Sequence, residues 1–190
     1  MNGKDYRRDL PHKFPDGASV FVTWRLEGSL PVPSDAENLM IQKLSARESL
    51  VRVEKLLDAA VVGPVWLTDP RIAELVCGAI EEGQNRFNRY RLHAYVVMSN
   101  HVHVLITPHH DMATIMNQLK GVTARRANQL LGMSGERFWQ RESFDRWCRD
   151  EDHFFKVWNY IRLNPVKVGL AKTPEGYRWG SAYRGVEQGI

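Results

Sequence analysis

Residues 95–108 read YVVMSNHVHVLITP, and this stretch decides the fold because it looks like two strands joined by a tight turn. Val, Ile, Leu and Tyr dominate both halves, as is typical of strands, and the pair Ser99-Asn100 suits a two-residue hairpin turn. The second half also carries His101 and His103. Side chains on a strand alternate between its faces, so both imidazoles point the same way, with Cα atoms about 6.6 to 7 Å apart. The stretch predicts a β-hairpin with paired imidazoles on one face.

Four helical segments flank the hairpin. Each begins at a residue whose side chain can accept a hydrogen bond from the first helical turn. These capping residues are Ser34, Asp69, Asp111 and Asp150, and the helices they open are expected over residues 34–60, 70–88, 112–131 and 151–163. The last helix should stop at Asn164-Pro165, because proline cannot continue the hydrogen-bond ladder.

Two further segments complete a sheet. Residues 18–26, ASVFVTWRL, are rich in β-branched and aromatic residues and predict a strand, whereas residues 136–149 predict either a fourth strand or an extended pair with a turn. Without the extra helix over residues 34–60 and the last helix, the order is βαββαβ. The sequence therefore predicts an α+β, ferredoxin-like fold, with helices on one face of an antiparallel sheet and the other face free for a ligand.

Length and composition favour a single domain. The chain has 190 residues, of which 43% are hydrophobic and 25% charged, as in ordinary globular proteins. We expect one domain over residues 1–172 and a loosely structured tail over residues 173–190. No apolar run is long enough to span a membrane, and residues 1–14 lack the core of a secretory signal. Cys77 and Cys148 fit no metal or redox spacing, so a reduced, cytoplasmic protein is expected.

Positive charge is concentrated in one part of the chain. Residues 120–172 contain eleven Lys and Arg against six Asp and Glu, whereas the rest contains fifteen against sixteen. A segment of this kind suits a ligand with a phosphate backbone. The alternative, a pair of solvated helix faces, explains the composition equally well.

A metal site built on the two histidines needs a further ligand and a reactive group. Tyr160 and Asn164 are four residues apart and so share one face of the last helix. An Asn carbonyl oxygen suits a hard ion, and this ligand set leaves coordination positions open for a substrate. Mg²⁺ and Mn²⁺ both suit mixed nitrogen and oxygen ligands. The residues alone leave a simpler alternative open, in which the histidines are hydrogen-bonded on their strand and Tyr160 packs under the sheet.

Three blocks, YVVMSNHVHVLITP, RFWQRESFDRW and YIRLNPVKVGL, occur in the order found in the REP-associated tyrosine transposases, and the chain resembles this family from about residue 19 to residue 169. The family belongs to the single-tyrosine HUH, or IS200-like, transposases. The resemblance implies metal-dependent cleavage and rejoining of single-stranded DNA at palindromic REP hairpins, through a 5′-phosphotyrosine link. It also implies a bacterial, nucleoid-associated protein and leaves open whether a monomer or a homodimer acts.

Carried onto this chain, the resemblance assigns His101, His103 and Asn164 as ligands of Mg²⁺ or Mn²⁺ and Tyr160 as the nucleophile. Phe138, Trp139 and Trp147 could stack unpaired bases, although core packing is the simpler expectation. Lys167 and Val168 depart from the Arg and small residue expected after Asn-Pro. The candidate contacts to the DNA backbone are Lys120, Arg125, Arg126, Arg137, Arg141, Arg146 and Arg149.

Three other functions remain open from the sequence. The chain could bind DNA hairpins without catalysis, although the intact set of His101, His103, Tyr160 and Asn164 argues against a decayed enzyme. It could be a nicking enzyme of the replication or conjugation type, although a single candidate Tyr favours the transposase branch. It could hydrolyse a small phosphoester, although the basic segment favours a polymer.

Overall fold

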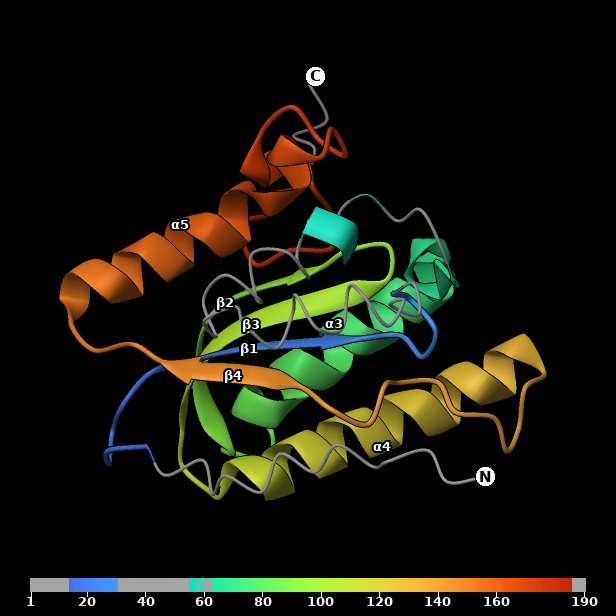
Figure 1. The fold of residues 1–190 in the computed structure, drawn as a ribbon, viewed down its shortest axis with the longest axis horizontal. Helices are drawn as coiled ribbons and strands as arrows, with labels where there is room; N and C mark the ends of the chain where they lie inside the picture. Colours follow the sequence, from blue (N-terminus) through green and yellow to red (C-terminus); the bar gives the residue numbers. More distant parts are fainter. Residues whose placement is uncertain (1–13, 31–54, 58, 60–62, 186–190) are drawn as a thin grey trace, which may run out of the picture.

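Four antiparallel strands form the sheet of the computed structural model, which describes residues 14–30, 55–57, 59 and 63–185. The strands are β1 (Val20–Arg25), β2 (Tyr90–Val97), β3 (His101–Pro108) and β4 (Phe144–Trp147). Their order across the sheet is β2-β3-β1-β4, with β1 in the centre beside the histidine-bearing strand (Figure 1). This is the ferredoxin-like order, and it confirms the predicted α+β fold.

The hairpin of β2 and β3 forms as predicted. The backbone N–H of Met98 donates to the carbonyl of His101 over 2.8 Å, so Ser99 and Asn100 make the two-residue turn. The pairing is regular except for a bulge at His93, where the register shifts between Leu92 and Ala94. In this register His101 pairs with Arg25 and His103 with Thr23 of β1, so residues far apart in the chain meet across the sheet.

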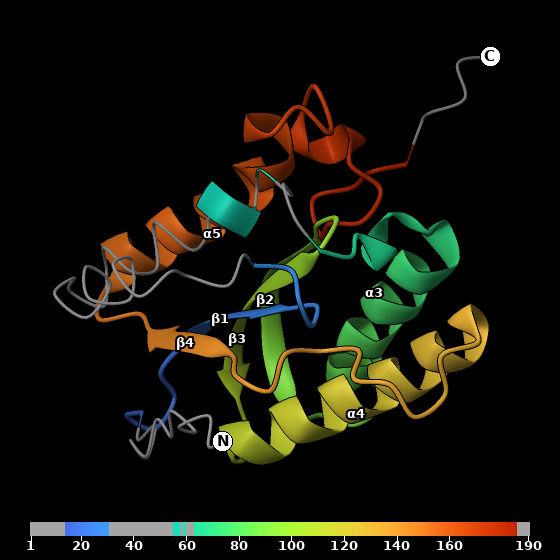
Figure 2. The same cartoon turned by 45° about the vertical axis from the view of Figure 1, so that its right-hand side comes forward.

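Helices α3 (Pro70–Asn85) and α4 (Met112–Leu131) cover one face of the sheet, and α5 (Glu151–Lys167) covers the other (Figures 1 and 2). Asp69, Asp111 and Asp150 cap the three helices through their side chains, as predicted. The face under α3 and α4 holds the larger core, which includes Val20, Val22 and Trp24. The helix predicted over residues 34–60 lies outside the described residues, apart from residues 55–57 and 59, which are helical.

Helix α5 does not stop at Asn164-Pro165 as predicted, but runs through Pro165 to Lys167. The proline lacks one backbone N–H, and this costs the helix one hydrogen bond near its end. The next turn still closes, because the backbone N–H of Val168 donates to the carbonyl of Asn164 over 3.3 Å. Asn164 therefore lies inside the helix and is fully buried.

Residues 173–185 are not the loosely structured tail that the sequence predicts. They return along the free edge of β2, where the N–H of Val97 donates to the carbonyl of Trp179 and the N–H of Ser181 donates to the carbonyl of Tyr95. The hydroxyl of Tyr177 adds a bond of 2.8 Å to the carbonyl of Val97. Local composition misses this pairing because the strand edge that satisfies these polar groups lies about 80 residues earlier in the chain.

The fourth strand forms in two short pieces, which matches the alternative of an extended pair. Trp139 makes an isolated bridge with Leu26, and β4 then pairs with β1 over residues 144–147. None of the described helices is both long and apolar enough to cross a membrane.

Candidate functional site

The two histidines meet side by side on the face of the sheet that α5 covers. Both side chains are fully buried, and the Nε2 atoms of His101 and His103 lie 3.0 Å apart. Each Nδ1 atom has a second partner at 2.7 Å, the Oδ1 atom of Asn100 for His101 and the Oγ1 atom of Thr23 for His103. Both rings are therefore held at their outer nitrogen, and their inner nitrogens converge on one point.

The contact with Asn100 indicates which nitrogen of His101 carries the proton. Asn100 donates through its Nδ2 atom to the carbonyl of Leu57, so its oxygen faces His101 and accepts from Nδ1–H. The inner nitrogen of neutral His101 then carries its lone pair toward the Nε2 atom of His103. Thr23 can donate to His103 or accept from it, because a hydroxyl does both. With Thr23 as the acceptor, both inner nitrogens present lone pairs, as metal ligation requires.

Burial keeps both imidazoles neutral. It lowers the pKa of His101 from 6.5 to about 3. The pKa of His103 is lowered well below its usual value, first by burial and then by the charges of His101 and Lys167. Neutral imidazole is the form that binds metal ions, so both rings are ready as ligands at neutral pH.

Helix α5 brings Tyr160 onto this pair. The centre of its ring lies 5.4 Å from that of His103 and 6.0 Å from that of Phe21, in edge-to-face contacts. One turn further along, Asn164 is 1% exposed, and neither polar atom of its amide has a hydrogen-bond partner among the described residues. Spacing of four residues places it on the helix face of Tyr160. An unsatisfied buried amide is costly, so Asn164 is a candidate ligand.

The residues fit a divalent cation. Two nitrogen ligands at about 2.1 Å from one octahedral ion are about 3.0 Å apart, which is the separation of the two Nε2 atoms. Asn164 offers the oxygen of an otherwise unsatisfied amide. No group of three or more His, Cys, Asp and Glu gathers as a metal site within the described part of the chain, so the candidate set depends on the Asn.

The seven basic residues expected to contact DNA are spread over both sides of the molecule. Arg125 and Arg126 are exposed on α4, across the sheet from the histidines. Arg146 pairs in register with Phe21, so the two side chains share the face of β1 and β4 that carries the Tyr160 contact. Three more of these residues are exposed outside the regular elements: Arg137, Arg141 and Arg149. The guanidinium of Arg137 lies 3.9 Å from the carboxylate of Glu27.

Lys120 has a structural role in addition to its predicted one. Its ammonium donates to the carbonyls of Gln140 and Arg141 over 2.7 and 2.8 Å, which fastens the chain before β4 onto α4. Burial lowers its pKa to about 8, although Glu142 and Glu27 act in the opposite direction. A contact of Lys120 with DNA stays a prediction.

The possibility that Phe138 and Trp139 stack on unpaired bases is wrong for this structure. Both side chains are less than 5% exposed and belong to the larger core, and the indole N–H of Trp139 donates to Thr123. Trp147 also packs partly against this core. The simpler expectation of core packing holds for all three.

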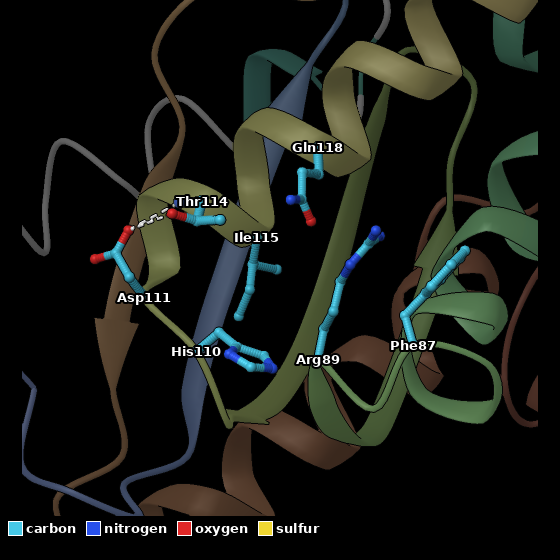
Figure 3. Close-up of a pocket in the computed structure, with 7 residues that line it drawn as sticks. All are labelled: Phe87, Arg89, His110, Asp111, Thr114, Ile115 and Gln118. Atoms are coloured by element: carbon cyan, nitrogen blue, oxygen red, sulfur yellow. Dashed lines mark hydrogen bonds between the residues drawn. The ribbon is translucent and has the colours of Figure 1, made fainter.

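Sequence reasoning missed Thr23, which gave no local signal because its contact with His103 joins two distant strands. The sequence marked Lys167 only as a departure from the family pattern, and the structure places its ammonium beside the Tyr160 ring. A separate hollow of about 420 Å³ lies at the other end of the hairpin, where Arg89, Gln118 and His110 converge beside Phe87 (Figure 3). The guanidinium of Arg89 lies 4.3 Å from the centre of the Phe87 ring.

Comparisons with known proteins show the family and the fold of the chain. A family model described as "Transposase IS200 like" matches residues 66–164, which include His101, His103, Tyr160 and Asn164. A solved structure of a REP-associated tyrosine transposase bound to a REP hairpin has the same fold, with a TM-score of 0.57 and 18% identity, over 94% of this chain and 82% of that one. No curated protein sequence matches significantly. With more than half of its length matched by the family model, the chain belongs to the IS200-like transposase family.

Proposed function

We propose that this transposase cleaves and rejoins single-stranded DNA beside palindromic hairpins, with Tyr160 as the nucleophile. The observation that carries the proposal is the contact of the Tyr160 ring with His103, whose inner nitrogen lies 3.0 Å from that of His101. A phenol beside two neutral imidazoles and an orphaned amide suits attack on a phosphodiester. All four residues come from one chain, so a second copy is not needed to complete the set.

The chemical step exchanges one phosphodiester for another. The phenol oxygen of Tyr160 attacks the scissile phosphorus and loses its proton, while the bond from phosphorus to the 3′-oxygen breaks. The 3′-oxygen leaves and takes a proton, and the 5′ end stays on Tyr160 as a phosphotyrosine. Attack by another 3′-hydroxyl reverses the step and rejoins two strands. No external energy source is required, because the bonds broken and formed are of the same kind.

His101, His103 and Asn164 would hold a divalent cation, Mg²⁺ or Mn²⁺. When bound, such an ion would neutralise the charge on the scissile phosphate. The chain itself orients the ligands through Asn100 and Thr23, as outer contacts of metal-binding histidines do. Phe21 packs on both Tyr160 and His103 and so fixes the phenol against the histidine pair.

Charge favours a polymer over a small phosphoester as the substrate. Arg146 shares the face that carries the Tyr160 contact, and Arg149 follows it in the chain, just before the N-cap of α5. The similar solved structure is bound to a REP hairpin, which supports a DNA hairpin as the ligand here. Contacts of this kind position a nucleic-acid backbone without reading its sequence.

A covalent-adduct assay tests the proposal. Labelled hairpin DNA with single-stranded flanks is incubated with the protein and Mg²⁺ or Mn²⁺, and the products are separated on a denaturing gel. We expect a protein–DNA band that disappears in Tyr160→Phe and in the presence of a chelator. Tyr183→Phe serves as the matched control, since this half-buried tyrosine lies near the end of the chain. Hairpin binding without an adduct under either ion would instead identify a binding protein.

A further inference from the structure

Lys167 is the last residue of α5, and its charged end lies beside the proposed nucleophile. The Nζ atom is 4.5 Å from the centre of the Tyr160 ring. The same ammonium acts electrostatically on His103, which places it near the histidine pair as well. One positive charge therefore lies against the Tyr160 ring and close enough to His103 to act on it.

Helix geometry explains how Lys167 reaches this point. Residues 160, 164 and 167 are spaced by four and three positions, so they form one stripe along α5. Tyr160 and Asn164 are the inner members of the stripe, whereas Lys167 is exposed at its end. The ammonium stands at the border between the buried site and solvent, from which a DNA strand must approach.

A structural role does not account for the lysine fully. A cation in the last turn of a helix and a cation over an aromatic ring are both favourable, but at an exposed position each effect is small. No carboxylate of the described residues pairs with Lys167, whereas the neighbouring Arg162 is paired with Glu175 at 2.8 Å. The charge at Lys167 is left available for an anion.

We propose that Lys167 is a further catalytic residue, whose ammonium binds a non-bridging oxygen of the scissile phosphate and stabilises the negative charge that develops as Tyr160 attacks. The inference rests on the proposed function, because it requires Tyr160 to be the nucleophile. Preorganised cations at this position act on the transition state more than on the bound substrate. The effect should therefore be on the rate of adduct formation and much less on DNA affinity.

A comparison of four proteins distinguishes a catalytic role of Lys167 from a general effect of lost positive charge. The proteins are the wild type, Lys167→Met, Lys167→Arg and Lys172→Met. Lys172 is an exposed lysine five residues further on and controls for net charge. With saturating hairpin DNA and Mn²⁺, we expect Lys167→Met to slow single-turnover adduct formation about 100-fold. Lys167→Arg should retain the rate within about tenfold, and Lys172→Met should match the wild type. Affinity for DNA, measured in a Tyr160→Phe background, should change less than about threefold with Lys167→Met.

A substrate with a neutral methylphosphonate at the scissile position supplies a second measurement. The non-bridging charge is absent there, so the difference between the wild type and Lys167→Met should shrink to a few-fold. Equal rates for Lys167→Met and the wild type on ordinary DNA, or an undiminished difference on the neutral linkage, would overturn the role of Lys167 while Tyr160 remains the nucleophile. A wild-type protein that forms no adduct, or an adduct that survives in Tyr160→Phe, would overturn both proposals.

Discussion

The Oγ1 atom of Thr23 lies 2.7 Å from the Nδ1 atom of His103, across the register pair that joins β1 to β3. Both residues are buried, so this single hydroxyl holds the orientation of the ring. Strand β1, which supplies none of the candidate metal ligands, thus positions the inner nitrogen of one of them.

Thr23→Val should therefore weaken metal binding while it preserves the strand. Valine has nearly the same shape but no hydroxyl, so His103 loses its outer partner. We expect the affinity for Mn²⁺, measured by calorimetry, to fall about 10- to 100-fold. Thr107→Val is the matched control, since Thr107 bonds to His93 at the other end of β3. Equal Mn²⁺ affinities of Thr23→Val and the wild type would contradict the role of the hydroxyl.

Acid should destabilise the fold through the buried histidines. The pKa of His101 is about 3 in the folded chain and 6.5 in the unfolded one, so below pH 6.5 only the unfolded form takes up the proton. Stability contributed by neutral His101 is present above pH 6.5 and is lost as pH falls towards 3. Between pH 7.5 and 5.5 the loss should be on the order of 1 kcal/mol for this residue.

Urea unfolding of metal-free protein at the two pH values measures this loss. The comparison is with His101→Gln, which cannot titrate at this position, so histidines that do not contact His101 cancel in the difference. The drop in the free energy of unfolding should be smaller in the variant than in the wild type. An equal drop in both proteins would mean that His101 takes up its proton in the folded state as well.

Asn164→Leu should make the metal-free protein more stable while it weakens metal binding. The amide of Asn164 is buried with neither polar atom satisfied among the described residues, and a side chain of similar size removes that cost. We expect a gain of about 1 kcal/mol in the free energy of unfolding, together with a loss of Mn²⁺ affinity. Opposite signs of the two effects are typical of a residue kept for function. A loss of stability would show that the amide supports the fold.

Substitutions at Lys120 and at the pair Arg125 and Arg126 should have different effects, the first on stability and the second on DNA binding. Lys120→Met removes two charge-assisted hydrogen bonds to backbone carbonyls and should cost about 1.5 to 3 kcal/mol of stability. The double change of Arg125 and Arg126 to Ala removes exposed charge and should leave stability nearly unchanged. If these two arginines contact phosphates, the slope of log affinity against log salt should fall by up to about 2. An unchanged slope would remove them from the DNA interface.

Local patterns allowed the hairpin, the helix starts and the shared face of the histidines to be predicted. Alternation along a strand and an Asp before a helix depend on neighbouring residues, so His101, His103 and the cap Asp111 could be assigned without a structure. The partner of His103 could not, because Thr23 lies 80 residues away in sequence. The end of α5 was predicted too early for a related reason. Proline usually ends a helix, but the last turn of α5 tolerates the loss of one backbone hydrogen bond at Pro165.

Removal of residues 173–190 should impair the position of α5 as well as the stability of the sheet. Arg162 of α5 pairs with Glu175 at 2.8 Å, and Tyr177 and Trp179 then bond to Val97 on the edge of β2. This segment therefore ties the helix that carries Tyr160 to the strand next to His103. A chain ending at residue 172 should melt at a lower temperature and form adduct more slowly. Glu175→Gln, which breaks only the ion pair, should reduce the adduct rate less than the truncation does. If residues 1–172 instead retain the full melting temperature and adduct rate, they form the complete domain and the return of the chain along β2 has no part in placing Tyr160.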